Sequence, residues 1–129
     1  MTKRNVALII ETSNDYARGI LRGIHEFTRT HHDWSVYLTE HGRHEPDESF
    51  IGNWEGNGVI ARIETARTAE MIRKLGVPTV DVSAARLLHG IPWVETDDQA
   101  ITEFAVGHLI DCGLNNLAFF GDPFYNWSR

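Results

Sequence analysis

The sequence predicts an α/β fold: an open parallel sheet with helices on both faces. Two observations predict this class. Short apolar runs of strand length alternate along the chain with segments whose apolar residues recur at helical spacing. The connections between these segments are short, as they are in successive strand–helix–strand units. A chain of 129 residues is long enough for one domain with a substantial core.

The first strand and the first helix organise the rest of the chain. Residues 6–10 are apolar without interruption, which is typical of a strand buried on both faces. The small polar residues that follow suit a turn and a helix cap. A helix is expected from about Ala17 until it fades near Thr30, because its apolar residues share one face.

The middle of the chain continues the alternation. Residues 34–38 alternate and are rich in β-formers, so they predict the second strand. Residues 41–48 are polar and predict a loop, and residues 49–54 predict a short helix or turn. Residues 59–61 follow an Asn-Gly turn signal and predict the third strand.

A third helix is predicted over residues 65–75. Thr65 can cap its first turn, and Gly76 follows its last residue, where glycine commonly ends a helix. Residues 79–82 then predict the fourth strand, which Pro78 introduces.

The last part of the chain predicts two more strands around the most periodic helix. Residues 91–94 predict a short strand, in which Pro92 favours an edge position. Thr96 or Asp97 would cap the helix, which ends at Gly113, and residues 117–120 predict the final strand. One helical face is expected to pack into the core, with a buried cysteine and a core histidine: Ile101, Phe104, Ala105, His108, Leu109 and Cys112. Because the sequence stops in a predicted loop, we expect a fragment of a longer chain.

Composition and charge narrow the class of partner. The formal net charge is -6, and no basic run exceeds two residues, which argues against direct binding to a nucleic-acid phosphate backbone. The single cysteine excludes an intrachain disulfide and fits a cytoplasmic protein. No apolar stretch is long enough for a membrane span, and the N-terminal apolar run is too short for a signal peptide.

Polar side chains follow the predicted strands, whose carboxyl ends form the usual ligand crevice of an open parallel sheet. Ser13, Asn14, Tyr16 and Arg18 follow the first strand. Later strands contribute Arg62, Asp81, Ser83, Asp97, Asp122 and Arg129. Hydroxyl, amide, carboxylate and guanidinium groups suit hydrogen bonds to a polyol, and an aromatic face packs on a sugar ring. The alternatives are that Asn14 or Asp15 and Thr96 or Asp97 are helix caps, and that Arg62 is a solvated surface residue.

Other chemistry finds little support in the sequence. No G-x-G-x-x-G follows the first strand, and no G-x-S-x-G is present. Arg62 stands where a phosphoacceptor receiver domain needs an aspartate. No two of the seven histidines pair at i, i+4 on a helix, so no metal, cofactor or catalytic residue is expected.

Several segments resemble a known family. Residues 93–98, 107–110 and 117–121 resemble the signature of ligand-sensing domains in lac-repressor-type regulators. The chain is more closely similar to the sensor half of bacterial xylose-operon regulators, which carry a C-terminal AraC-type DNA-binding domain. The matching residues are Asn14-x-Tyr16-x-Arg18, Gly23, Trp54-x-Gly56-x-Gly58-Val59-Ile60-Ala61, Val77-Pro78 and Thr96-Asp97.

This resemblance implies a periplasmic-binding-protein-like type I fold with flavodoxin-like topology, of which residues 1–129 form the N-terminal lobe. It implies a cytoplasmic regulator that binds a sugar, D-xylose first among candidates, between two lobes. DNA is contacted only through a domain outside this chain, no membrane is involved, and the protein is a homodimer without enzymatic activity. The expected ligand-binding residues are Ser13, Asn14, Tyr16, Arg18, Asp81 and Arg129.

Two rival classes remain open at this point. The first is a transport sugar-binding protein with the same fold, which a secretory leader or lipid anchor would favour. The second is a flavodoxin-like enzyme or phosphate-binding domain, in which the loop at residues 12–14 would hold a nucleotide or phosphate.

Overall fold

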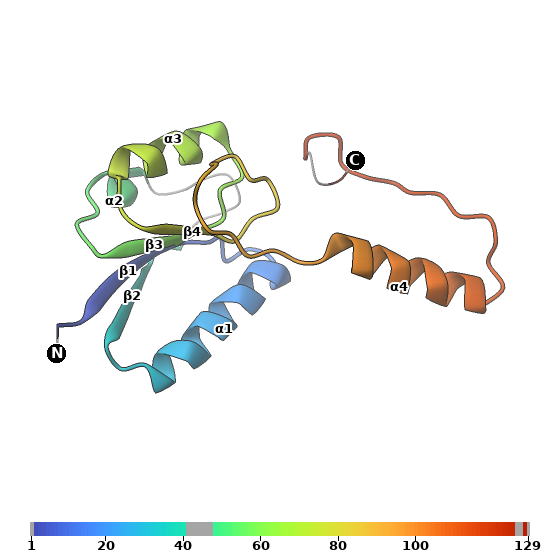
Figure 1. Cartoon of the computed structure of the whole chain (residues 1–129), viewed down its shortest axis with the longest axis horizontal. Coiled ribbons are helices and arrows are strands. Elements are labelled where there is room, and N and C mark those ends of the chain that lie inside the picture. Colours follow the sequence, from blue (N-terminus) through green and yellow to red (C-terminus); the bar gives the residue numbers. More distant parts are fainter. Residues whose placement is uncertain (1, 41–47, 126–127, 129) are drawn as a thin grey trace. The chain divides into compact units, whose positions relative to one another are not determined.

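The computed structural model describes residues 2–40, 48–125 and 128. The chain divides into two units, Met1–Val94 and Glu95–Arg129. Figure 1 shows their elements. The first unit contains β1 (Arg4–Ile9), α1 (Asp15–Thr30), β2 (Trp34–Leu38), α2 (Glu48–Gly52), β3 (Gly58–Ala61), α3 (Ala66–Leu75) and β4 (Thr79–Asp81). The second unit contains α4 (Asp98–Asp111).

The four strands form one parallel sheet in the order β2-β1-β3-β4. The register places Ala7 opposite Tyr37 on one side and Val59 on the other, so β1 lies inside the sheet. The chain passes from β1 to β2 on one side and then to β3 on the other side of β1. The topology therefore switches at the carboxyl ends of β1 and β3, where open parallel sheets bind ligands.

Two apolar clusters cover the two faces of the sheet. Ala7 and Ile9 of β1 pack with residues of α2 and α3, and Val6, Leu8 and Ile10 pack with residues of α1. Figure 1 shows α1 on the opposite side of the sheet from α2 and α3. Because both faces of β1 are covered, its apolar run has no polar alternation. The predicted α/β class, with helices on both faces, is confirmed.

Helix ends follow the local chemistry of the sequence. Asn14 caps α1 with its side chain, so the helix begins at Asp15, two residues earlier than expected. Thr65 caps α3, and Gly76 ends it in the left-handed conformation at φ 66°. Asp97 caps α4 through a 2.9 Å bond from the Ala100 amide. The predicted loop at residues 41–48 lies, up to residue 47, outside the described residues.

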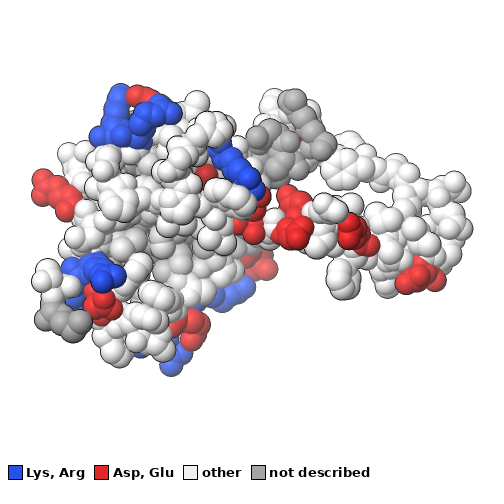
Figure 2. All heavy atoms as spheres, in the orientation of Figure 1, with Lys and Arg blue, Asp and Glu red and all other residues white. Residues whose placement is uncertain are grey.

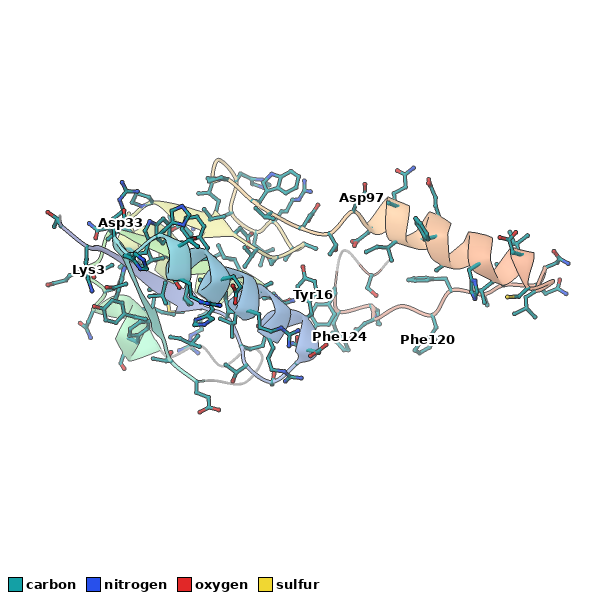
Figure 3. All side chains as sticks on the ribbon, turned by 90° about the horizontal axis from the view of Figure 1, so that it is seen from below. Lys3, Tyr16, Asp33, Asp97, Phe120 and Phe124 are labelled. Carbon is teal, nitrogen blue, oxygen red and sulfur yellow. The ribbon has the colours of Figure 1, made fainter. Side chains whose placement is uncertain are left out.

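Two predicted strands are wrong as stated. Residues 91–94 make only an isolated bridge between Trp93 and Asp81. In it the Asp81 amide donates to the Pro92 carbonyl, and the Val94 amide donates to the Asp81 carbonyl. Residues 117–120 are rich in β-forming residues but form no strand, and Phe120 is 100% exposed (Figure 3). A strand requires a hydrogen-bonded neighbour, which the pattern of a single segment does not supply.

The helix predicted before residues 117–120 is confirmed as α4, but the prediction that one of its faces packs into the core is wrong. No residue of α4 is buried, and Phe104 is 85% exposed. His108 and Cys112 were expected in the core and are exposed. Within the described residues of Glu95–Arg129, no second helix or strand packs on α4, whose apolar residues lie all round the helix rather than on the one predicted face.

The second unit also has an uneven charge. Residues 95–128 contain no Lys or Arg, and their acidic residues are Glu95, Asp97, Asp98, Glu103, Asp111 and Asp122. Figure 2 accordingly shows α4 with uncharged and acidic atoms only. Across the described residues, no helix has the length and apolar composition needed to cross a bilayer.

Candidate functional site

The carboxyl ends of β1, β3 and β4 bring polar residues together. The Arg62 amide donates to the Ile9 carbonyl at 2.9 Å, and the Val82 amide donates to the Ala61 carbonyl at 2.8 Å. These bonds continue the strand ladders just past the assigned ends of the strands. The residues that follow the three strands are thereby held next to one another, as the sequence predicts.

A buried ionic triad lies at this point. Arg62 pairs through Nη1 with Glu11 Oε1, and through Nη2 with Glu64 Oε1 at 2.7 Å. The Arg62 side chain is 10% exposed, and those of Glu11 and Glu64 are 4% and 5% exposed. Ions taken out of water are tolerated only when they are paired in this way. The alternative in which Arg62 is a solvated surface residue is therefore wrong.

Asn14 joins the triad to the start of α1. Its Oδ1 accepts from the Ala17 amide at 2.8 Å, which is the helix cap, and its Nδ2 donates to Glu11 Oε1 at 2.7 Å. Capping and the contact with Glu11 thus use opposite ends of one amide group. Tyr16, in the first turn of α1 (Figure 3), is half-exposed, and the Arg62 guanidinium lies 5.1 Å from its ring centroid.

Asp81 is buried at the end of β4. Its Oδ1 accepts from the Ser83 amide at 2.9 Å and the Ile63 amide at 3.3 Å. The Ser83 hydroxyl donates to the Ile63 carbonyl at 3.1 Å. The pKa of the Asp81 carboxyl is raised above its ordinary value of 3.8, mainly because the group is buried. The hydrogen bonds from Ser83 and Ile63 oppose this increase, and the negative charge of Glu64 adds to it.

Two buried polar atoms lack a hydrogen-bond partner among the described residues: Arg62 Nε and Asp81 Oδ2. Most buried polar atoms in folded proteins are satisfied, so an unsatisfied donor and acceptor mark a place where a polar ligand or water is expected. Both residues belong to the strand ends described above.

Ser13 and Arg18 lie near the start of α1. Ser13 is exposed in the loop before α1. Arg18 donates to the Thr12 carbonyl at 3.2 Å and pairs with Asp15 at 3.5 Å, and it is half-exposed. Arg129 lies outside the described residues. Asp97 serves as the α4 cap, and Asp122 accepts from the Phe124 amide at 2.9 Å.

Sequence reasoning missed Glu11 and Glu64 as members of the site. Glu11 directly follows the apolar run of β1, and Glu64 lies two residues after Arg62. An acid at the end of one buried strand and an arginine at the end of another are complementary charges. That complementarity was the available signal, but it depends on β1 and β3 being neighbours.

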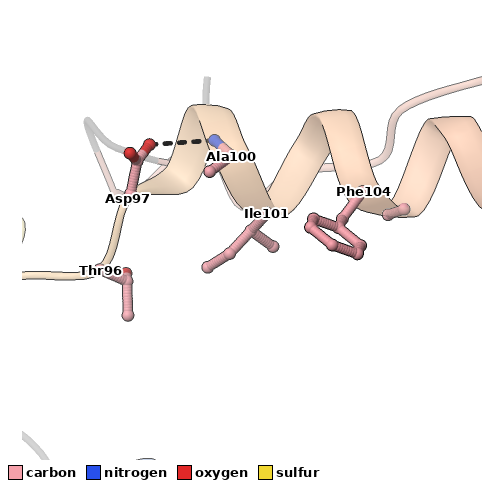
Figure 4. Close-up of a pocket in the computed structure, with 6 residues that line it drawn as sticks. Thr96, Asp97, Ala100, Ile101 and Phe104 are labelled. Carbon is pink, nitrogen blue, oxygen red and sulfur yellow. Dashed lines mark hydrogen bonds between the residues drawn. The ribbon is translucent and has the colours of Figure 1, made fainter.

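A concave surface lies along α4 (Figure 4). It is lined by Thr96, Asp97, Ala100, Ile101, Phe104 and Ala105. This hollow is lined mostly by apolar side chains and offers few polar groups for recognition. Among the described residues, no group of three His, Cys, Asp or Glu side chains is arranged to hold a metal ion.

The arrangement at the strand ends holds its donors and acceptors in fixed positions. The Ser83 hydroxyl is occupied by a backbone carbonyl, and the Arg62 guanidinium is held by two carboxylates. A fixed set of donors and acceptors beside an aromatic ring is typical of sites for small polar ligands.

Comparison with known proteins identifies related sequences and folds. A family model described as the XylR N-terminal domain matches residues 5–99. A xylose operon regulatory protein from Escherichia coli strain K12 is 30% identical over 128 residues, or 95% of this chain and 32% of that protein. One from Haemophilus influenzae strain Rd is 26% identical over 121 residues, or 90% of this chain and 31% of that protein.

A solved structure, of a xylose-binding transcription activator named XylR, has the same fold. It matches with a TM-score of 0.79 at 24% identity, over 99% of this chain and 33% of that chain. The fold is therefore the flavodoxin-like α/β fold of type I periplasmic-binding proteins. The chain spans about a third of the length of the curated relatives it matches. Because the family model matches well over half of its residues, the chain belongs to the family of XylR N-terminal domains.

Proposed function

We propose that this chain is the sugar-sensing part of a bacterial transcription regulator, and that its effector is D-xylose. The observation that carries the proposal is the buried polar cluster at the β1–β3 switch point, where this fold binds ligands. Membership of the XylR N-terminal domain family supports the regulatory class, and the names of the relatives support the choice of sugar.

The proposed contacts follow from the chemistry of a sugar. Each hydroxyl both donates and accepts a hydrogen bond, so it is matched by a cluster that offers amide, carboxylate and guanidinium groups. Asn14, Tyr16 and the neighbouring Arg62 form the centre of the site, with the exposed ring of Tyr16 available to a sugar face. Ser13, Arg18, Asp81 and Arg129 stay in the proposed contact set.

The proposed mechanism is a shift between two arrangements of a two-lobed protein. This chain would form the N-terminal lobe, and the sugar would bind the closed arrangement more tightly than the open one. That difference in affinity is the only free energy available to change the state of an attached DNA-binding domain. In this proposal the protein acts in the cytoplasm, catalyses no reaction and contacts DNA through another part of the complete protein.

We also propose that the complete protein is a homodimer. Within the described residues of Glu95–Arg129, no second helix or strand packs on the apolar side chains of α4, and a second copy would bury such a surface. Sedimentation of the complete protein at several concentrations tests this, and a monomer at every concentration contradicts it.

Calorimetric titration of the complete protein with a panel of pentoses and hexoses tests the sensor proposal. Saturable binding of D-xylose, weakened by Asn14→Ala, is the expected result. Glu26→Gln is the matched control, because Glu26 lies on the exposed side of α1 and pairs with Arg29. A folded protein that binds no sugar overturns the proposal.

A further inference from the structure

Glu11 holds both of the side chains at the centre of the site. Its Oε1 accepts from Asn14 Nδ2 at 2.7 Å and from Arg62 Nη1. Glu64 accepts from the other terminal nitrogen, Nη2, at 2.7 Å. Both terminal nitrogens of the guanidinium therefore already donate to carboxylates of this chain.

This arrangement weakens the anion-binding ability of Arg62, because two carboxylates outweigh its single positive charge. A guanidinium recognises a ligand carboxylate or phosphate through a pair of parallel N–H bonds, supported by its positive charge. Here Glu11 and Glu64 occupy that role on Arg62. An anionic ligand would therefore meet a cluster with one net negative charge and be repelled by the two buried carboxylates, which is unfavourable.

One nitrogen of the Arg62 guanidinium has no hydrogen-bond partner among the described residues. It is Nε, on a side chain that is nine-tenths buried. A single N–H suits the oxygen of one neutral hydroxyl. The guanidinium plane is also fixed, by Glu11 and Glu64 at its ends and by Tyr16 at its face. Such a group has one orientation to offer and loses little entropy when a ligand binds.

We propose that Glu11 is a specificity-determining positioning residue: by holding Arg62 and Asn14, it makes the site select uncharged sugars over sugar acids. This inference rests on the proposed sugar-sensing function. Glu11 acts through Arg62 and Asn14, since its Oε1 contacts both of them.

The test compares the complete wild-type protein with Glu11→Gln, which keeps the shape of the side chain and removes its charge. The probes are D-xylose and D-glucuronate, which has the xylopyranose ring with an added carboxylate, and D-glucose controls for the added bulk. In the wild type, D-glucuronate is expected to bind at least roughly tenfold more weakly than D-xylose. In Glu11→Gln, Arg62 is released from one carboxylate. The ratio of the dissociation constant for D-glucuronate to that for D-xylose is therefore expected to fall by roughly tenfold.

The ratio distinguishes selectivity from a general loss of structure. Glu26→Gln keeps the wild-type ratio, and the ratio of D-glucose to D-xylose stays constant in every variant. If Glu11→Gln does not fold by circular dichroism, Glu64→Gln is measured with the same expectation. An unchanged ratio, including one in which neither protein binds D-glucuronate, overturns the inference alone. A folded wild type that binds no uncharged sugar overturns the proposed function, and this inference with it.

Discussion

Replacing Arg62 by methionine tests whether the buried triad is an energetic centre of the fold. The substitution keeps an unbranched side chain of similar length and removes the charge. It leaves the carboxylates of Glu11 and Glu64, 4% and 5% exposed, facing one another without their common partner. Breaking a buried ion pair from one side costs about 3–5 kcal/mol. That is a large part of the roughly 5–15 kcal/mol that stabilises an ordinary domain.

The assay is urea unfolding of wild type and variant, followed by tryptophan fluorescence and analysed by linear extrapolation. Arg29→Met is the matched control, since Arg29 pairs with Glu26 at 3.3 Å with both side chains exposed. Such an exposed pair contributes less than about 1 kcal/mol. A loss in Arg62→Met no larger than that in Arg29→Met refutes the reasoning.

A double variant separates the pair from its surroundings. Adding Glu11→Gln to Arg62→Met removes the charge of one of the two carboxylates that have lost Arg62, so the double variant is expected to be more stable than the sum of the single losses. Strict additivity would mean that Glu11 and Arg62 do not interact energetically, despite their contact.

Three further predictions follow from single groups. Asn14→Ala removes a cap and a partner of Glu11 and should cost about 1–2 kcal/mol in urea unfolding, more than Asp97→Ala, whose cap lies in an exposed helix. Asp81→Asn should change the pH dependence of unfolding: the pKa of Asp81 is raised in the fold, so its carboxyl contributes stability that is present below pH 3.8 and lost as pH rises through the raised pKa. The wild type should therefore lose stability relative to Asp81→Asn across that window, and parallel pH profiles would contradict it. Gly56→Ala should lower the unfolding midpoint, because an added Cβ would lie 2.7 Å from a backbone carbonyl and against the Trp54 ring; an unchanged midpoint would contradict this contact.

The parts of the fold that the sequence predicts well are those decided by local chemistry. The apolar run of β1 predicts a doubly buried strand, and both faces are covered. Asn14, Thr65 and Asp97 were each considered as caps, and each accepts the expected backbone N–H. A cap or a helix end involves residues three or four positions apart, so a short stretch of sequence contains all of its partners.

The parts that the sequence predicts poorly depend on neighbours that are distant in the chain. The periodicity before Gly113 is sufficient to predict α4 but not what covers Phe104. The β-forming residues at 117–120 do not specify a partner strand. The candidate site follows the same rule. That Arg62 is buried, and paired with Glu11, follows from the β1–β3 register, which places Ile9 opposite Ala61.

The same register explains why binding and stability are coupled at this site. Glu11 follows β1, Arg62 and Glu64 follow β3, and Asn14 begins α1, so one hydrogen-bonded network joins two strands and a helix. A ligand that satisfies Arg62 Nε would act on all three elements at once. Substitutions in the network are therefore expected to change affinity and stability together. For this reason the ratio of affinities for charged and uncharged sugars, rather than affinity itself, identifies the role of Glu11, because a uniform loss of folded protein cancels from that ratio.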